Sequence, residues 1–304
     1  MPRVKRGLSG LSLVVGVNKP AGMSSHDVVN RCRSIFGERR VGHTGTLDPM
    51  ATGVLPICVG PATRLGAYLT GHDKRYRVSI AFGAGTDTDD AAGTVVRTGE
   101  VPDRVLDPEF AAAFVASLVG RRKQMPPAYS AIKVNGKKSC EAARAGNIID
   151  LAPRDIEVYD ARLLGVHEGD GEELPSWDVS FEVSKGTYIR TLCHDLGQAL
   201  GCGGCMAALR RTEASNFRID EAVTLEDVQR EGEALLRPTD SLFRQYPAYT
   251  IPSTEQERKC LCGNPLRAKF PDGLYRVYGR DGAFLALSEA KDGTLTSKRN
   301  FFSV

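Results

Sequence analysis

Alternating apolar and polar residues predict two half-buried strands in the middle of the chain. Residues 75–82 (RYRVSIAF) carry Tyr, Val, Ile and Phe at every second position, and residues 177–183 carry Trp, Val, Phe and Val in the same way. A period of two is typical of a strand with one face on a core. A shorter apolar run at 13–17 predicts a buried first strand.

Three segments show the period of a helix instead. Residues 24–37 begin with the capping-box pattern of Ser24 and Asp27 and end at a glycine. Residues 109–119 form an amphipathic pattern that a glycine also closes, and residues 189–200 keep their apolar residues on one face. We therefore predict helices over these three ranges.

From about residue 247 the pattern changes to short strands separated by tight turns. Residues 274–278 and 283–287 flank Asp281-Gly282, a strong hairpin signal, and another turn is expected at Asp292-Gly293. These signals predict a small all-β module of about sixty residues, near the lower size limit for independent folding. A chain of 304 residues exceeds the usual single-domain length, which also favours one large domain and one small one.

Composition and charge narrow the class of protein. The sequence is 41% hydrophobic and 25% charged, as in soluble globular proteins, and its apolar runs are too short to span a membrane. The basic N-terminus with its apolar run is only superficially similar to a secretion signal, because Gly10, Ser12 and Gly16 interrupt the run. We expect a cytoplasmic protein. The net charge of +3 permits a nucleic-acid partner without requiring one.

Neither the cysteines nor the acidic residues predict a metal site. Cys202 and Cys205 make a CxxC, and Cys260 and Cys262 make a CxC, but this combination matches no standard zinc spacing. The acidic segment 83–93 lacks the glycine and glutamate positions of an EF-hand. We expect plain thiols, a solvated acidic loop and no bound metal.

Basic residues gather in two places. Arginines 31, 33, 39 and 40 would lie on the outer face of the helix at 24–37 or just beyond it, where solvent is the ordinary environment and RNA phosphates are the alternative. Residues 121–138 contain six basic residues and no acid, with Tyr129 and a Pro-Pro pair among them. Two interpretations fit this segment equally well: an ordinary solvent-exposed basic loop, and a mobile loop that grips an RNA backbone.

Residues 42–56, GHTGTLDPMATGVLP, hold a single carboxylate, Asp48, among small residues. No second acid stands beside it, and the sequence has no GxxxxGK[ST] loop for nucleotide phosphates. The residues alone leave two interpretations open: an Asp-Pro turn, or a lone nucleophilic or basic Asp with room for a flat substrate. Arg190, where the strand at 177–183 turns into the next helix, is the leading candidate for a cation that keeps Asp48 ionised.

The stretch around Asp48 resembles the central catalytic motif of the TruB family of pseudouridine synthases. Other motifs resemble this family and follow in its order: NKPAGMSS at 18–25, KRY at 74–76, PPAYSA and GKK within 126–138, SKGTYIRTL and DLG within 184–197, and LRRT at 209–212. The family usually has Asp before the Lys-Pro, where this chain has Asn18. The tail beyond residue 246 resembles a PUA-type RNA-binding module through weaker motifs.

The resemblance implies a pseudouridine synthase fold of the α+β class, with a mixed, mainly antiparallel central sheet flanked by helices and loops. It implies a catalytic domain at 1–246 that contains an RNA-gripping insertion at about 121–153, and a small all-β PUA-like RNA-binding domain at 247–304. The activity implied is that of an isomerase, a tRNA pseudouridine synthase, which detaches the base of the T-loop uridine (position 55 by convention), rotates it and rejoins it through C5. No cofactor is expected, because no electrons or groups leave the system.

The resemblance also assigns site residues. Asp48 would attack the sugar or remove a proton from it, Arg190 would pair with Asp48, and Tyr76 would stack on the base and could help remove the C5 proton. His43 would wedge into the T loop and fill the space left by the flipped base. The implied substrate-binding residues are His43, Tyr188, Leu209, Lys19 and Arg64.

The implied partner is tRNA, bound through its T-arm stem-loop by a monomer with neither a guide RNA nor a membrane. A second hypothesis is a guide-dependent ribosomal-RNA pseudouridine synthase, which would need partner proteins and usually a longer basic tail. A third is an RNA-binding chaperone that folds tRNA by gripping its elbow. The presence of Asp48, Tyr76 and Arg190 argues against chaperoning as the sole role.

Overall fold

The chain folds into two units, each with its own set of internal contacts. The first comprises Met1–Pro49, Gly53–Gly71 and Ser215–Val304, and the second comprises Met50–Thr52 and His72–Ala214. The computed structural model describes residues 9–66, 71, 73–134, 136–170, 173–267 and 269–301. The basic N-terminal residues 1–8 lie outside the described residues.

The first unit is built on antiparallel strands around β1 (Leu13–Lys19). This strand pairs with β3 (Thr52–Val59) on one side and with β14 (Arg237–Pro238) on the other, and β2 (Val41–His43) also pairs with β3. The predicted first strand is confirmed and continues two residues further, so that Lys19 is its last residue.

Helix α1 (Ser25–Phe36) follows directly, and its ends are those that the sequence predicts. Ser24 and Asp27 form both bonds of the capping box, and Gly37 closes the helix in the left-handed conformation. Val28, Val29 and Cys32 form its buried face. The same unit holds α6 (Leu225–Glu231), which packs against α1 and also carries a capping box.

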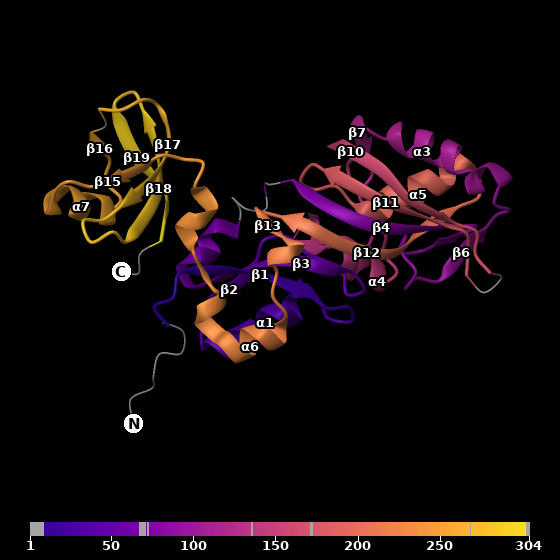
Figure 1. Ribbon diagram of the computed structural model, residues 1–304, viewed down its shortest axis with the longest axis horizontal. Helices are drawn as coiled ribbons and strands as arrows, with labels where there is room; N and C mark the ends of the chain where they lie inside the picture. The colour runs from indigo at the N-terminus through magenta and orange to yellow at the C-terminus, as the bar shows by residue number, and fades with distance from the viewer. Residues whose placement is uncertain are drawn as a thin grey trace. The chain divides into compact units, whose positions relative to one another are not determined.

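The second unit contains antiparallel strands in the order β12-β4-β11-β10-β7 (Figure 1). Strands β4 (Lys74–Phe82) and β11 (Ser176–Val183) bury every second residue, as their alternation predicts. Trp177 is fully buried between Phe82 and Phe114, and its indole nitrogen donates to the carbonyl of Val105 at 2.7 Å. The other strands are β12 (Gly204–Ala214), β10 (Arg154–His167) and β7 (Gly120–Gln124).

Two helices pack on this sheet. Helix α3 (Pro108–Ala116) lies against β10, and α5 (Ile189–Leu200) lies against β12 and β4. A Cβ atom at Gly197 of α5 would lie only 2.1 Å from the backbone nitrogen of Gly204, so glycine is what allows helix and strand to approach. Both helices are confirmed, although α3 ends three residues before the predicted limit of 119.

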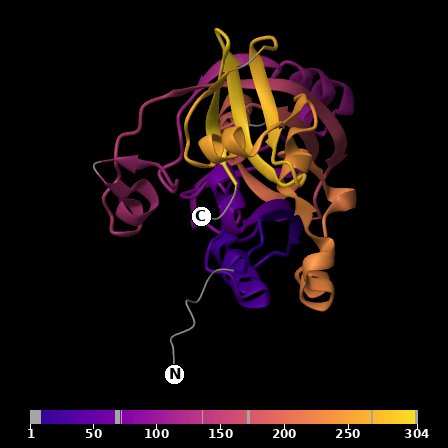
Figure 2. The same cartoon turned by 90° about the vertical axis from the view of Figure 1, so that its left-hand side faces the viewer.

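Two segments expected to be loops contain strands. Residues 120–124 form β7, an edge strand paired with β10, and only the residues after it leave the sheet. Beyond it lie β8 (Lys133–Val134), β9 (Lys137–Lys138) and α4 (Ser139–Arg144), which stand away from the sheet of their unit in Figure 2. The acidic segment contains β5 (Ala84–Thr86), paired with β6 (Val95–Thr98). The prediction of unbroken loops was therefore wrong in these parts.

The C-terminal residues of the first unit form a separate five-stranded sheet. Its hairpin turns fall at Asp281-Gly282 and Asp292-Gly293, as predicted. The module also contains helix α7 (Thr254–Leu261), which the prediction of an all-β module omitted. The strands are β15 (Ala248–Thr250), β16 (Leu266–Arg267), β17 (Gly273–Tyr278), β18 (Phe284–Lys291) and β19 (Thr294–Asn300).

The remaining elements are short. They are β13 (Phe217–Arg218) and the 3-10 helices η1 (Gly60–Leu65), η2 (Asp103–Leu106), η3 (Ile219–Glu221), η4 (Gly232–Leu235) and η5 (Thr239–Phe243). Phe243 of η5 packs on Phe284 and Phe301, so the linker shares the aromatic cluster of the C-terminal module. No helix within the described residues has both the length and the apolar character needed to cross a membrane.

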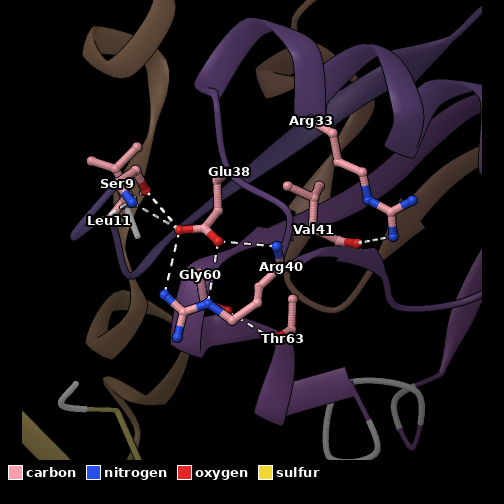
Figure 3. Close-up of polar contacts among 8 residues, drawn as sticks. All are labelled: Ser9, Leu11, Arg33, Glu38, Arg40, Val41, Gly60 and Thr63. Carbon is pink, nitrogen blue, oxygen red and sulfur yellow. Dashed lines mark hydrogen bonds and ion pairs between the residues drawn. The ribbon is translucent and has the colours of Figure 1, made fainter. Parts of the chain in front are cut away.

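A buried carboxylate organises the turn between α1 and β2 (Figure 3). Glu38 is 1% exposed and accepts hydrogen bonds from the backbone and hydroxyl of Ser9 and from the backbone and guanidinium of Arg40. The carbonyl of Arg40 in turn accepts from the nitrogen of Gly60 at 2.7 Å. Burial opposes the ionised form of Glu38, but the bonds from Arg40 and Ser9 outweigh it and lower its pKa from 4.5 to about 2.

Replacing Glu38 with Gln should lower the free energy of unfolding at neutral pH by about 2 kcal/mol. Because the folded pKa is depressed, the carboxylate's contribution is present above about pH 4.5 and is lost as the pH falls toward about 2. The difference between the variant and the wild type should therefore shrink over that range in urea titrations at a series of pH values. Glu226→Gln, an exposed residue on α6, is the control. A difference that stays constant with pH would contradict this assignment.

Candidate active site

The loop that carries Asp48 is fixed on its N-terminal side by a buried serine. Asp48 is half-buried between β2 and β3 and follows Leu47, which is 3% exposed. The hydroxyl of Ser25, the first residue of α1, accepts from the Leu47 nitrogen at 2.8 Å and donates to the Leu47 carbonyl at 2.9 Å. One side chain thus satisfies both polar backbone groups of the residue before Asp48.

A buried ammonium fixes the other side of Asp48. Lys19 ends β1 with 0% exposure, and its Nζ donates to the carbonyls of Pro20, Met23 and Pro49 at 2.8, 2.6 and 3.1 Å. The Pro49 carbonyl also accepts from the nitrogen of Gly22 at 2.9 Å. The resemblance implies that Lys19 binds substrate, and this role stays a prediction. In the structure its ammonium holds the backbone that flanks Asp48.

His43 lies at the start of the same loop, at the end of β2. It is half-buried, and its Nδ1 accepts from the nitrogen of Gly45 at 3.3 Å. Thr44 beside it is 1% exposed, donates its backbone nitrogen to the Pro56 carbonyl at 3.1 Å, and lies 3.4 Å from the hydroxyl of Ser215 through its own hydroxyl. The small residues of the motif therefore form a loop anchored at both ends, more than a simple Asp-Pro turn.

In the second unit, Arg190 joins the start of α5 to two loops. The guanidinium is 7% exposed; one terminal nitrogen donates to the Thr88 carbonyl at 3.1 Å and the other to the Tyr129 carbonyl at 3.0 Å. The first of these nitrogens also lies 3.8 Å from a carboxylate oxygen of Asp90. Arg190 therefore connects the acidic segment 83–93 with the basic segment 121–138 inside one unit.

The acidic segment is not the solvated loop that the sequence predicts. Asp90 is 7% exposed, and its other carboxylate oxygen accepts from the Thr88 hydroxyl at 2.8 Å and the Ala92 nitrogen at 3.1 Å. Asp89 lies 3.0 Å from Nδ1 of His194 on α5, and this hydrogen bond raises the pKa of His194. Two adjacent acids thus attach the segment to the first turns of α5.

Tyr188 is placed by an amide that the sequence analysis overlooked. It is the residue before α5, and its backbone nitrogen donates to Oε1 of Gln124 at 2.9 Å while its carbonyl accepts from Nε2 of Gln124 at 3.0 Å. Gln124 is 2% exposed at the end of β7. A side-chain amide thereby pairs with the backbone of Tyr188 as a neighbouring strand would.

Tyr76 and Leu209 lie on the buried face of their sheet. Tyr76 on β4 is 6% exposed and faces Phe181 on β11 and Arg211 on β12 in register, and Leu209 faces Val78. Lys74 shares the face of Tyr76, and burial, reinforced by the charge of Arg211, lowers the pKa of Lys74 to about 8. Two buried cations, Lys74 and Arg211, therefore lie near Tyr76.

Most of the arginines that could contact RNA form hydrogen bonds with other residues of this chain. Arg64 donates to the carbonyl of Asn300 at 3.1 Å, and Arg33 to that of Val41 at 3.2 Å. Arg31 binds the side chain of Gln229, and Arg40 binds Glu38. Arg39 is exposed without such a contact among the described residues, so it is the one of arginines 31, 33, 39 and 40 that best suits a phosphate.

The cysteines and acids do not gather into a metal cage within the described residues: no group of three or more His, Cys, Asp or Glu could hold an ion there. Cys202 and Cys205 are buried, and burial raises the pKa of both thiols. In the other unit Cys260 is buried and Cys262 is exposed.

The predicted site residues divide between the two units. Asp48, His43, Lys19 and Arg64 belong to the first, and Tyr76, Tyr188, Arg190 and Leu209 belong to the second. Within each unit the structure shows how these residues are held. The pairing of Asp48 with Arg190 stays a prediction.

Three positioning residues escaped the sequence analysis. Ser25 follows the capping Ser24 and looks like part of the same cap, Gln124 is an amide at the end of a basic run, and Asp90 is one acid among several. Nothing in their local sequence distinguishes them, because their roles depend on contacts with residues at least 22 positions away, as Ser25 with Leu47.

Two family descriptions and many curated proteins match this sequence. The description "TruB family pseudouridylate synthase (N terminal domain)" matches residues 33–189, and "tRNA pseudouridylate synthase B C-terminal domain" matches residues 190–244. Proteins named tRNA pseudouridine synthase B are similar over nearly the whole chain. That of Mycobacteroides abscessus is 43% identical over 95% of this chain and 96% of its own, and that of Francisella philomiragia is 37% identical over 98% and 97%.

Solved structures share the fold at lower identity. An H/ACA ribonucleoprotein chain bound to a substrate RNA containing 2'-deoxyuridine matches with a TM-score of 0.66 and 22% identity, over 96% of this chain and 85% of that one. A chain of the archaeal box H/ACA Nop10-Cbf5 complex matches with the same TM-score and identity. These matches confirm the predicted fold class.

Replacing Lys19 with Met should loosen the backbone around Asp48, because buried carbonyls lose their donor. We expect the free energy of unfolding to fall by about 3 kcal/mol and hydrogen exchange to accelerate in residues 44–51, measured by mass spectrometry of deuterated peptides. Lys259→Met removes the same charge from an exposed ion pair and is the control. Unchanged exchange in residues 44–51 would show that Lys19 does not hold this loop.

Proposed function

Because the chain belongs to the TruB family of pseudouridine synthases, we propose that it isomerises a uridine of tRNA to pseudouridine and that its target is the T-loop uridine at position 55. Relatives that carry the name tRNA pseudouridine synthase B support the substrate, since they match this chain over nearly its full length. The observation that carries the proposal is the anchoring of the backbone on both sides of Asp48 by Ser25 and Lys19.

The chemistry requires one well-placed carboxylate. The glycosidic bond of the uridine breaks, the uracil turns, and a new bond forms between C5 of the base and C1' of the same ribose. The C5 proton is lost to solvent and N1, which was bonded to the sugar, gains a proton, so the product has the same atoms as the substrate and no redox partner or group carrier takes part. In the proposed mechanism Asp48 promotes detachment by attacking the sugar or by removing one of its protons. A fixed loop supports either role. A carboxylate that is already held in place loses little conformational entropy when it takes up the orientation that the reaction needs.

Arg190 and Tyr76 complete the proposed catalytic group. A guanidinium next to Asp48 would favour its ionised form, and the two carbonyls that Arg190 binds would hold the guanidinium in one orientation. Tyr76 would stack on the uracil and assist the loss of the C5 proton. Tyr188, positioned by Gln124, and Leu209 would line the pocket for the base.

RNA binding would involve parts of the chain outside the catalytic group. The target base must leave its stack before Asp48 reaches it, which costs a few kcal/mol, and His43 would fill the space it vacates. We propose that the insertion at about 121–153 and the PUA-like domain at 247–304 contact RNA phosphates, with most of the affinity and its salt dependence arising there. We further propose that the chain works as a monomer in the cytoplasm and without a guide RNA.

The decisive variant is Asp48→Asn, which keeps the size of the side chain and removes its charge. Wild-type protein should release tritium from an unmodified tRNA transcript labelled at C5 of uridine, up to one equivalent per tRNA. The variant should release none while binding the transcript with unchanged affinity. Asp220→Asn, an exposed acid near Arg218, is the matched control and should behave as wild type. Tritium release by Asp48→Asn at the wild-type rate would refute the assigned role of Asp48.

A further inference from the structure

The solvent face of strand β4 carries two arginines whose neighbours on the adjacent strands differ in charge. Because side chains alternate along a strand, Arg75 and Arg77 point away from the face that buries Tyr76 and Val78. Strand β4 lies between β11 and β12, so each of its residues has a neighbour on both sides (Figure 1). The charge near each arginine therefore depends on the residues opposite it on β11 and β12.

Arg75 is neutralised on both sides. Its register partners are Glu182 on β11 and Glu213 on β12, and its guanidinium lies 3.0 Å and 3.6 Å from their carboxylates. Such opposite-charge pairs across strands stabilise a sheet. The positive charge of Arg75 is therefore balanced by the protein itself and does not call for a bound anion.

Arg77, two residues further on, faces no acid. Its register partners are Ser180 on β11 and Arg210 on β12, so two exposed arginines stand directly opposite each other. Within the described part of the chain neither guanidinium takes part in an ion pair or a hydrogen bond. Like charges directly opposite on neighbouring strands destabilise the pairing, and an anion between them would relieve that repulsion.

A pocket of about 390 Å³ opens at these two arginines. Its lining includes Ser79 and Thr52, whose hydroxyl donates to the Leu209 carbonyl at 3.4 Å. The apolar lining residues include Met50, Leu164, Val78 and Leu209. Leu164 is 51% exposed, so part of the apolar lining faces water. The one acid in the lining, Asp178, lies 3.1 Å from Nε2 of His167, and its register position is opposite Ser79, not opposite either arginine.

We propose that this pocket binds a phosphodiester of the RNA backbone, with the phosphate between Arg77 and Arg210 and the adjoining ribose against Met50 and Leu164. The paired guanidiniums suit the charge and the several acceptor oxygens of a phosphate. The apolar lining favours a sugar-phosphate over a free phosphate ion, which would leave Leu164 in water. Arg77 and Arg210 lie on the face of the sheet opposite Tyr76, so they would hold a phosphate away from the reacting base. This inference rests on the proposed function, since it assumes an RNA substrate.

The test compares two double variants that remove the same charge from the same face. Arg77→Gln with Arg210→Gln removes the proposed site, and Arg75→Gln with Arg162→Gln removes two arginines that are paired with acids. The dissociation constant for unmodified tRNA is measured over a series of KCl concentrations. Unfolding of each variant is followed in urea, where the first double variant should be at least as stable as the wild type, because it removes a repulsion.

We expect the Arg77/Arg210 variant to bind tRNA about tenfold more weakly at moderate salt, with a slope of log affinity against log salt reduced by about 1. The Arg75/Arg162 variant should keep the wild-type slope. Equal slopes in both variants would overturn the proposal, while tritium release by the wild type would show that the proposed function stands. If millimolar inorganic phosphate at constant ionic strength raised the urea midpoint of the wild type but not of the Arg77/Arg210 variant, and left the wild-type affinity for tRNA unchanged, the pocket would be a site for the free ion, and the RNA assignment would fail.

Discussion

The buried ammonium of Lys19 is the contact on which the candidate site depends. A charge removed from water is costly unless hydrogen bonds replace its hydration, and here three backbone carbonyls do so. One of these carbonyls belongs to Pro49, the residue after Asp48. The hydrogen bond that helps to replace the hydration of the Lys19 ammonium therefore also fixes the backbone of Pro49. Ser25 fixes the residue before it. The carboxylate is therefore held through its backbone neighbours.

The second unit uses the same device with a different cation. Arg190 has a planar guanidinium, so its two terminal nitrogens reach carbonyls of two separate segments at once, which a lysine could not do in the same geometry. Around it, Asp90 and the bond between Asp89 and His194 attach the acidic segment to α5. In both units a buried cation bound to carbonyls orders a loop that has little apolar surface to bury. This explains how a motif rich in glycine and threonine can form an ordered loop.

Most of the fold could be predicted, because local signals set its elements. The alternation in β4 and β11 and the capping box of α1 are encoded within a few residues, and the structure keeps their limits within one or two positions. The short strand β7 could not be predicted, since a basic run becomes a strand only when a distant edge, here β10, is available to pair with it. Strand β5 pairs with the nearby β6, but its three residues, Ala-Gly-Thr, carry no strand period. Helix α7 was missed because its polar sequence lacks a clear apolar period. At the site, the motifs pointed to Asp48 and Arg190, whose catalytic roles stay predictions. The contacts of Lys19 with Pro49, of Gln124 with Tyr188 and of Asp90 with Arg190 join residues far apart in the sequence and have no local signature.

The account's central claim is that an anchored Asp48 serves the isomerisation of one particular uridine in tRNA. Its most direct test is to incubate unmodified tRNA transcript with the protein under single-turnover conditions and to map pseudouridine by carbodiimide modification and primer extension. The account predicts one new stop, at the T-loop uridine, and its absence from a transcript with cytidine at that position. Stops at other uridines, or none at all with tRNA bound, would contradict it.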